Sequence, residues 1–138
     1  MPEKKTIERA RRDKREGKAP STQAGEFVRE EIEHIRHGKH GARSTKQAIA
    51  IGLSKARRSG VKLPAPKGEK AATTKRSTKK PSPARSRAAE KALKREPRAA
   101  ASKKALSKQA KSAAKKRSAK SRSAAAKKAA RTRARNAA

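Results

Sequence analysis

Lysine and arginine side chains are the groups in this 138-residue chain whose chemistry is easiest to predict. Residues 64–138 contain 26 basic and 3 acidic residues, and they supply +23 of the formal charge of +32. Such side chains neutralise phosphates and release the counterions condensed on a nucleic acid, so affinity falls steeply with salt. About ten engaged cations would give a slope near −9 against the logarithm of salt concentration for duplex DNA. The charge therefore predicts a polyanionic partner rather than a merely solubilising tail, and nothing in the tail is suited to reading base edges.

The cations that we expect to contact nucleic acid lie in a loop at residues 38–43, at the end of a helix near residue 58, and along the tail. They are Lys39, Arg43, Lys55, Arg57, Arg58, Lys79, Lys80, Arg85, Arg87, Lys103, Lys104, Lys108, Lys111, Lys115, Lys116, Arg117, Lys120, Arg122, Lys127, Lys128, Arg131, Arg133 and Arg135. The group near residue 58 serves the helix dipole, nucleic acid, or both.

One local pattern in the tail is more specific. Ser82-Pro83-Ala84-Arg85 matches the Ser-Pro-x-Arg/Lys pattern of linker-histone tails. There a compact turn lies in a narrow minor groove, whose negative potential attracts cations such as Arg85 and Arg87. A single copy also arises by chance in a chain this rich in Ser, Pro and Arg, so both interpretations stay open.

Three histidines, His34, His37 and His40, lie beside a group of glutamates. On a helix, Glu30, His34 and His37 would share one face, which is one way to bind a metal ion. The other interpretation is a ladder of i,i+4 pairs, Glu30 with His34 and Glu33 with His37, on a solvated face. We favour the ladder, because a small hairpin offers no second shell of ligands, and we predict neither a metal nor a cofactor.

No constellation of residues predicts an enzyme. The chain has no cysteine, which excludes a thiol nucleophile, a disulfide and a cysteine-based zinc finger. Ser44 and Ser54 have no positioned base, and Gly38-x-x-Gly41 lacks the strand–turn–helix context of a phosphate loop. The 38–43 loop is either an ordinary helix–helix turn or a phosphate site that uses Lys39, Arg43 and the amides of the following helix. With one aromatic residue, base-stacking platforms are also excluded.

The elements that would position these groups are helices in residues 1–63, which hold 10 of the 12 Leu, Ile, Val and Phe residues. We expect a short helix over 6–16, a second over about 22–37 and a third that begins after Ser44 and ends at Gly60. In the second helix, Val28, Ile32 and Ile35 fall at i, i+4 and i+7 and form one apolar stripe.

The third helix carries the clearest local signals. Ser44 and Gln47 fit a capping box, and Gly60 followed by Val61 fits a Schellman stop. The second and third helices together predict a helical hairpin over about 22–60. Its apolar surface is small, so we expect marginal stability and weak self-association or a partner.

The composition changes near Pro64 and predicts three regions: a small helical region over 1–63, a Pro-containing basic linker over 64–97 and a Lys/Arg/Ala-rich tail over 98–138. Alanine and lysine favour a helix, but uncompensated like charges at i,i+4 oppose it. We therefore expect the tail to be mostly unfolded alone and to become helical on binding. The predicted fold class is mostly α and largely disordered.

Two resemblances accompany these residues. The segments Gly25–Glu31, Gly38–Gly41 and Lys46–Arg58 resemble a family of small basic bacterial proteins, carried mainly as a domain of unknown function, in which some members are labelled plasmid stabilisation or histone-like. Residues 64–138 resemble, in composition, the Lys/Ala-rich C-terminal domain of linker histones and bacterial histone-like proteins; the winged helix of linker histones is absent. The resemblance implies a bacterial, cytoplasmic protein with a DNA-associated role, and it supplies no catalytic or binding residues.

Taken together, these features predict non-sequence-specific DNA binding by a basic, histone-like, nucleoid-associated protein that coats or bridges duplex DNA. The alternatives are an RNA- or ribosome-associated protein, and a plasmid- or phage-maintenance adaptor that acts through the hairpin. No apolar run approaches the length of a transmembrane helix, and the first residues have no apolar segment typical of a secretory signal. We therefore expect a cytoplasmic, nucleoid-associated protein with no membrane partner.

Overall fold

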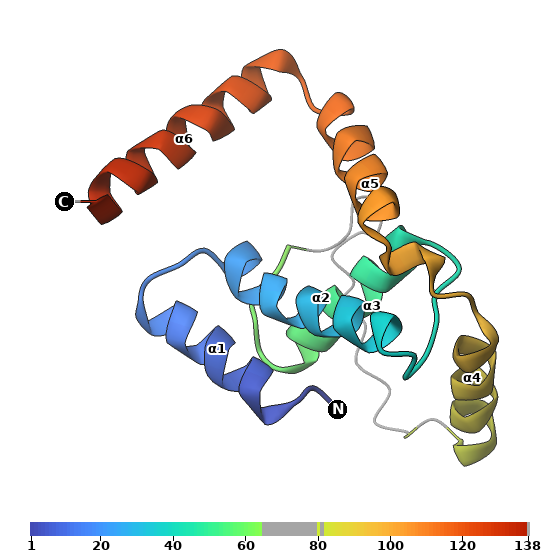
Figure 1. Cartoon of the computed structure of the whole chain (residues 1–138). Coiled ribbons are helices and arrows are strands. Elements are labelled where there is room, and N and C mark those ends of the chain that lie inside the picture. Colours follow the sequence, from blue (N-terminus) through green and yellow to red (C-terminus); the bar gives the residue numbers. More distant parts are fainter. Residues whose placement is uncertain (65–79, 81, 138) are drawn as a thin grey trace. The chain divides into compact units, whose positions relative to one another are not determined.

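The structure is a computed structural model that describes residues 1–64, 80 and 82–137 (Figure 1). All regular structure in these residues is helical, so the expected mostly α class is confirmed. The elements are α1 (Lys4–Arg15), α2 (Pro20–Arg36), α3 (Thr45–Arg58), α4 (Pro83–Arg95), the 3-10 turn η1 (Ala99–Ala101), α5 (Lys103–Lys115) and α6 (Ala119–Ala137). The chain divides into an amino-terminal unit (Met1–Ser102) and a carboxy-terminal unit (Lys103–Ala138).

Local sequence signals set the ends of α3 as expected. Ser44 Oγ accepts a hydrogen bond from the Gln47 amide at 3.2 Å, while the Gln47 side chain accepts from the Arg43 amide at 2.7 Å. At the other end Gly60 has φ +94°, a left-handed conformation that most side chains disfavour. The Val61 amide then donates to the Ala56 carbonyl at 3.1 Å, which is the predicted Schellman stop.

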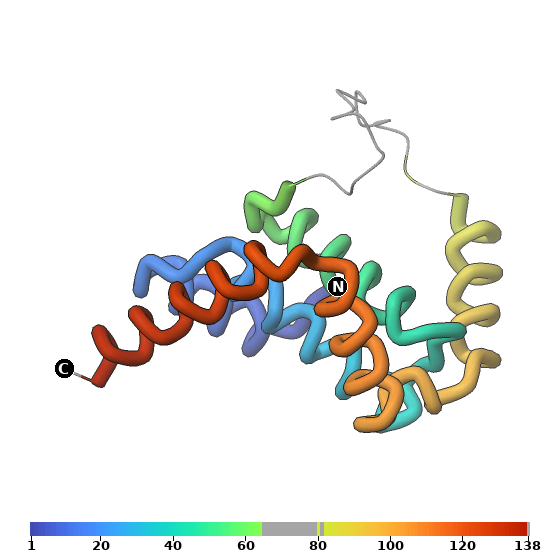
Figure 2. The backbone as a smooth tube through the Cα atoms, turned by 90° about the horizontal axis from the view of Figure 1, so that it is seen from above, coloured from blue at the N-terminus to red at the C-terminus, as the bar shows by residue number. Residues whose placement is uncertain are grey.

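The core of the amino-terminal unit lies where α2 packs against α1 and α3; the three helices lie together in both ribbon views (Figures 1 and 2). Ala10, Ala24, Phe27 and Ala56 are buried there, and Leu53 packs against them. The predicted hairpin is thus present, and α1 covers part of its apolar surface. Met1 is the one large apolar side chain, among those described, that is fully exposed.

A second contact closes the amino-terminal unit and was not expected from the sequence. After α4, residues 96–101 (the returning segment) lie against the loop between α2 and α3. The amide of Gly41 donates to the Leu93 carbonyl at 2.9 Å and that of Ala42 to the Pro97 carbonyl at 3.1 Å. Thr45 Oγ1 donates to the Ala100 carbonyl at 2.7 Å. The returning segment therefore belongs to the same unit as the hairpin.

The side chains of the returning segment bury with the loop. Ala100 and Ala101 are buried, at 8% and 0% exposure. Arg36 Nε donates to the Ala101 carbonyl at 2.9 Å, so this backbone acceptor of a buried residue has a hydrogen-bond partner. Small side chains suit this position, because the segment must approach the backbone of the loop closely.

The expectation of a largely disordered chain is not supported. Within the predicted linker and tail, the described residues form α4, α5 and α6. Local signals account for this: Ser82 caps α4 by accepting from the Arg85 amide at 3.3 Å, with Pro83 in its first turn, and Ser118 Oγ accepts from the Ser121 amide at 3.2 Å at the start of α6. Between the caps, alanine and lysine supply favourable propensity, which the sequence argument weighed too lightly against repulsion.

Candidate functional site

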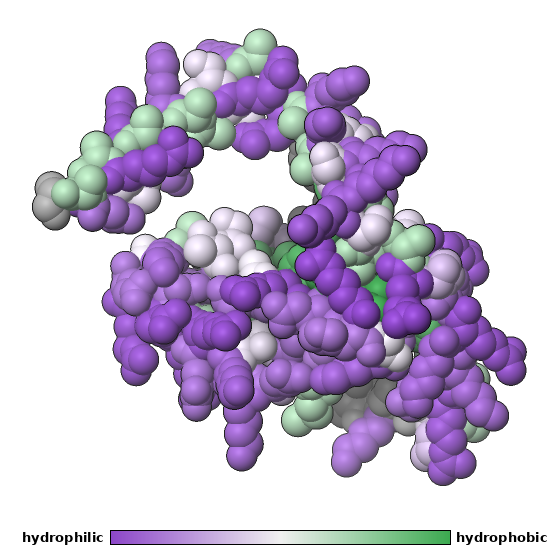
Figure 3. All heavy atoms as spheres, viewed as in Figure 1, coloured by the Kyte–Doolittle hydropathy of each residue, from purple (hydrophilic) through white to green (hydrophobic). Residues whose placement is uncertain are grey.

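The carboxy-terminal unit presents its cations on exposed helices. Along α5, Lys104, Lys108, Lys111 and Lys115 are exposed and recur at i, i+4, i+7 and i+11, which places them on one face. With Ser107, Ser112 and Lys116 they line one surface hollow. On the face drawn in Figure 3, hydrophilic side chains project along both α5 and α6, with more hydrophobic ones between them.

The other predicted cations of this unit are exposed as well. They are Lys103, Lys116, Arg117, Lys120, Arg122, Lys127, Lys128, Arg131, Arg133 and Arg135. Arg117 donates to the Ser121 hydroxyl at 3.2 Å, which ties its guanidinium to the first turn of α6. Residues 103–138 contain no acidic side chain, so no side-chain carboxylate of this unit neutralises its cations. The electrostatic potential around these helices is therefore positive along their length.

The predicted cations of the amino-terminal unit are placed differently. Arg43 has an 84% exposed side chain with Glu96 at 3.7 Å, and Lys39 Nζ lies 3.0 Å from Glu3 Oε1. Lys55 instead points inward, with a side chain 20% exposed, and donates to Glu31. Lys55 is therefore occupied by an internal ion pair and is not a surface cation.

The end of α3 and the start of α4 hold the remaining predicted cations. Arg58, Lys80, Arg85 and Arg87 are exposed, while Lys79 lies outside the described residues. Arg57 Nη2 donates to the Pro64 carbonyl at 3.2 Å and so fastens the chain after α3. The Ser-Pro-x-Arg pattern forms the amino-terminal cap of α4, which gives Ser82 and Pro83 a structural role and leaves Arg85 on the surface.

The loop at 38–43 offers few free amides for a phosphate. The amides of Gly41 and Ala42 donate to the Leu93 and Pro97 carbonyls, and that of Arg43 donates to the Gln47 side chain. These donors are used inside the fold. A phosphate at this loop would therefore depend on the side chains of Lys39 and Arg43 and on the first amides of α3, so both interpretations of the loop stay open.

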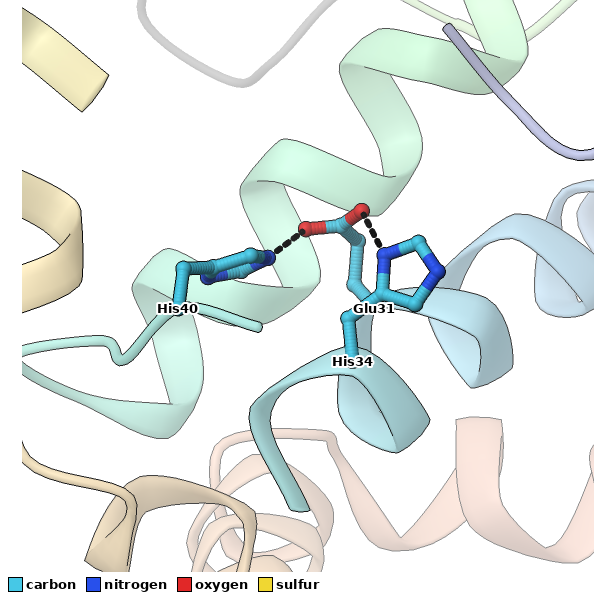
Figure 4. Close-up of side chains that lie close together, drawn as sticks. All are labelled: Glu31, His34 and His40. Atoms are coloured by element: carbon cyan, nitrogen blue, oxygen red, sulfur yellow. Dashed lines mark ion pairs between the residues drawn. The ribbon is translucent and has the colours of Figure 1, made fainter. Parts of the chain in front are cut away.

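A second group of ionisable side chains lies inside the amino-terminal unit. Glu31, with a side chain 1% exposed, reaches toward two imidazoles (Figure 4). Its Oε1 lies 3.6 Å from His34 Nδ1, and its Oε2 lies 3.1 Å from His40 Nε2. Glu31 and His34 come from α2 and His40 from the loop, and each contributes one donor atom within 4.8 Å of the others. This triad of Glu31, His34 and His40 has the donor types of a metal site.

Further charged groups surround the triad. Lys55 Nζ lies 3.6 Å from Oε1 of Glu30, whose side chain is 3% exposed, in addition to its bond to Glu31. Glu3 Oε1 lies 3.1 Å from His34 Nε2, and the Glu3 amide donates to Glu30 Oε2 at 3.1 Å. Hydrogen bonds from His34, then from Lys39, lower the pKa of the Glu3 carboxyl to about 2.

The arrangement of the histidines was predicted only in part. Glu30 and His34 do approach, at 3.9 Å, but Glu33 pairs with Arg29 at 3.0 Å rather than with His37, which is exposed. His40 enters the triad instead, because Gly38, at φ +76°, ends α2 and turns the chain back toward Glu31. The sequence feature that could have indicated the role of His40 is its position two residues after Gly38, the glycine that ends the helix.

The fold and these two features define a small helical protein with a cationic surface and a buried Glu–His cluster. Among the described residues, no helix combines the length and apolar character needed to span a bilayer. Residues 3–67 match the model of a family of unknown function, DUF6496. The match covers α1 to α3 and stops before α4. No curated protein and no solved structure matches the chain significantly.

Proposed function

We propose that this protein binds duplex DNA without sequence preference, and that it coats or bridges DNA as a histone-like, nucleoid-associated protein of the cytoplasm. The observation that supports this most directly is the carboxy-terminal unit, with 14 cations and no acidic side chain. The described part of that unit exposes these cations on α5, on α6 and in the turn between them. The partner is identified by its chemistry, a dense and regular array of phosphates.

The face of α5 explains why no sequence is read. From Lys104 to Lys115 the helix rises about 16 Å, and duplex DNA presents about ten phosphates over that length. Each lysine can therefore reach a phosphate at many different positions of the helix along the duplex. Long flexible side chains neutralise charge in all of them and carry no fixed pattern of donors toward base edges.

Bridging follows from the charge of both units. The amino-terminal unit carries 29 basic residues against 11 acidic ones, a net charge of +18, although part of this charge is used in internal pairs. The carboxy-terminal unit carries +14. Each unit is therefore able to bind phosphates, so one chain has two cationic surfaces for two duplex segments.

The test is the salt dependence of binding to a labelled duplex, measured by fluorescence anisotropy with the full chain. Replacing Lys104, Lys108, Lys111 and Lys115 together by Gln should lower the magnitude of the salt slope by as much as about 3.6. The matched control replaces the same four residues by Arg, which keeps the charge and should keep the slope. An unchanged slope in the Gln variant would contradict the role of α5, and a strong preference for structured RNA over DNA would favour the RNA-associated alternative.

A further inference from the structure

Hydrogen bonds fix which nitrogens of the two triad histidines carry protons. His40 Nδ1 lies 2.9 Å from the Gly41 carbonyl, which only accepts, so Nδ1 must hold a proton. His34 Nε2 lies 3.1 Å from Glu3 Oε1, a carboxylate oxygen that also accepts. In neutral imidazoles the remaining nitrogens, His40 Nε2 and His34 Nδ1, are therefore lone pairs.

Both lone pairs face the same buried carboxylate. His40 Nε2 and His34 Nδ1 are the atoms that lie 3.1 and 3.6 Å from the two oxygens of Glu31. Oε2 of Glu31 receives no hydrogen bond, although the side chain is 1% exposed. Three electron-rich atoms thus converge around a fully buried carboxylate, with the imidazoles 13% and 17% exposed, which is unfavourable unless positive charge lies between them. Either two extra protons or one divalent cation would supply it.

We propose that Glu31, His34 and His40 bind a divalent transition-metal ion, with Zn²⁺ as the ion that the donor set fits best. Two imidazole nitrogens and one carboxylate suit zinc, whereas Mg²⁺ and Ca²⁺ prefer all-oxygen sites. Two ligands at about 2.05 Å on a tetrahedral zinc lie about 3.3 Å apart. His40 Nε2 lies 3.1 Å from Oε2 of Glu31, close to that value, and the three donor atoms lie within 4.8 Å of one another.

The surroundings of the triad have the form of an outer shell. Histidines that bind a metal almost always donate their other ring N–H to a carboxylate or a backbone carbonyl, which orients the ring. Glu3 does this for His34 and the Gly41 carbonyl for His40. Three protein ligands leave the fourth tetrahedral position for water.

Lys55 is the group that opposes a cation here, because it donates to Glu31. Its bond is to Oε1, so Oε2 stays available to the ion. Three carboxylates, of Glu3, Glu30 and Glu31, also lie around the triad against the ammonium groups of Lys39 and Lys55. Three carboxylates and two ammonium groups leave one net negative charge, so binding of a divalent ion would leave one net positive charge. The ammonium group of Lys55 therefore does not exclude the site.

Metal binding would connect two parts of the fold. Glu31 and His34 lie on α2, while His40 lies in the loop that accepts the returning segment. An ion held by all three would fix the loop to the helix. The inference concerns the amino-terminal unit alone and does not depend on nucleic-acid binding.

The test uses the full chain, freed of metal with a chelator, and ZnCl₂ in isothermal titration calorimetry at neutral pH. We expect one Zn²⁺ per chain and a melting temperature that rises with Zn²⁺. His40→Gln and His34→Gln should each weaken binding at least tenfold, in line with the loss of a ligand. His37→Gln is the matched control, because His37 is exposed on the same helix end and should bind Zn²⁺ as the wild type does.

Equal binding by His37→Gln and His40→Gln, or no binding by the wild type, would overturn the proposal in favour of a cluster held by protons. Should a variant lose its helical circular dichroism, Co²⁺ in the wild-type chain decides the question. Intense visible absorption typical of a tetrahedral site supports the proposal, and its absence overturns it. Neither readout involves DNA, so failure here is distinguishable from failure of the proposed function.

Discussion

Replacing Gly52 by Ala should destabilise the protein, because α2 and α3 cross with almost no space between their backbones at this point. A Cβ added to Gly52 would lie 2.6 Å from Val28 Cα, 2.9 Å from Val28 N and 3.0 Å from Val28 Cγ2. Two of these atoms belong to the backbone, so no side-chain rotation relieves the contact. The helices must separate by several tenths of an ångström. Overpacking of this kind costs about 1–3 kcal/mol, and more where the backbone must move.

Helix propensity favours the Gly52→Ala variant and offsets part of this packing cost. Ala in place of Gly in a helix interior gains about 1 kcal/mol. The expected net change for Gly52→Ala is therefore a loss on the order of 1 kcal/mol in the free energy of unfolding, measured by urea denaturation followed by circular dichroism. Gly25→Ala is the control, since Gly25 lies in α2 with nothing within 4 Å of its added Cβ.

The control should shift in the other direction and gain about 0.5–1 kcal/mol. A Gly52→Ala variant as stable as the wild type, or more stable, would refute the close crossing of α2 and α3. Equal shifts of the same sign in both variants would show that propensity alone governs these positions. The comparison thus separates packing from propensity within one protein.

Three further variants test other contacts. Gly41→Ala would place a Cβ against the backbone carbonyl of Glu96 and so weaken the contact of the returning segment with the loop. Hydrogen exchange should therefore quicken at the Ala42 amide, which donates to the Pro97 carbonyl. Unchanged exchange at this amide would contradict the contact between the returning segment and the loop. Lys55→Met would leave the Glu31 carboxylate without its ammonium partner. The free energy of unfolding, measured by urea denaturation, should fall by an amount on the order of 3 kcal/mol. An unchanged free energy of unfolding would show that the ion pair with Lys55 does not stabilise the fold. Ser44→Ala removes the cap of α3 and should cost about 1 kcal/mol in the same assay, whereas Ser44→Asp should restore most of it.

Local signals explain what the sequence could predict of the fold. The ends of α2 and α3 depend on residues a few positions apart: Gly38 and Gly60 in left-handed conformations, and Ser44 as a cap. Such effects involve the chain's own backbone within one turn, so they are visible in the sequence itself. The apolar stripe of α2 likewise needs only periodicity.

Contacts between distant residues explain what could not be predicted. The end of α4 bonds to the α2–α3 loop from Leu93 to Gly41, across 52 positions, through backbone groups that carry no side-chain signal. Lys55 shows the same limit: in a chain with 43 basic residues, composition gives no reason to single out the one that faces Glu31. Both features are set by packing after the helices form, and the spacing of residues in the sequence does not encode that packing in any simple way.

The inward direction of Lys55 has a consequence for chemical modification of this protein. Acylation removes the charge of a lysine and proceeds on amines that reach solvent. The lysines of α5 and α6 are exposed and none forms an ion pair with a described carboxylate, while Lys55 is shielded within its pair. Progressive acylation would therefore remove the charge of the exposed lysines, those of α5 and α6 included, before that of Lys55, on which the interior depends. Under the proposed function, acylation would therefore weaken DNA binding while the helical hairpin stays folded.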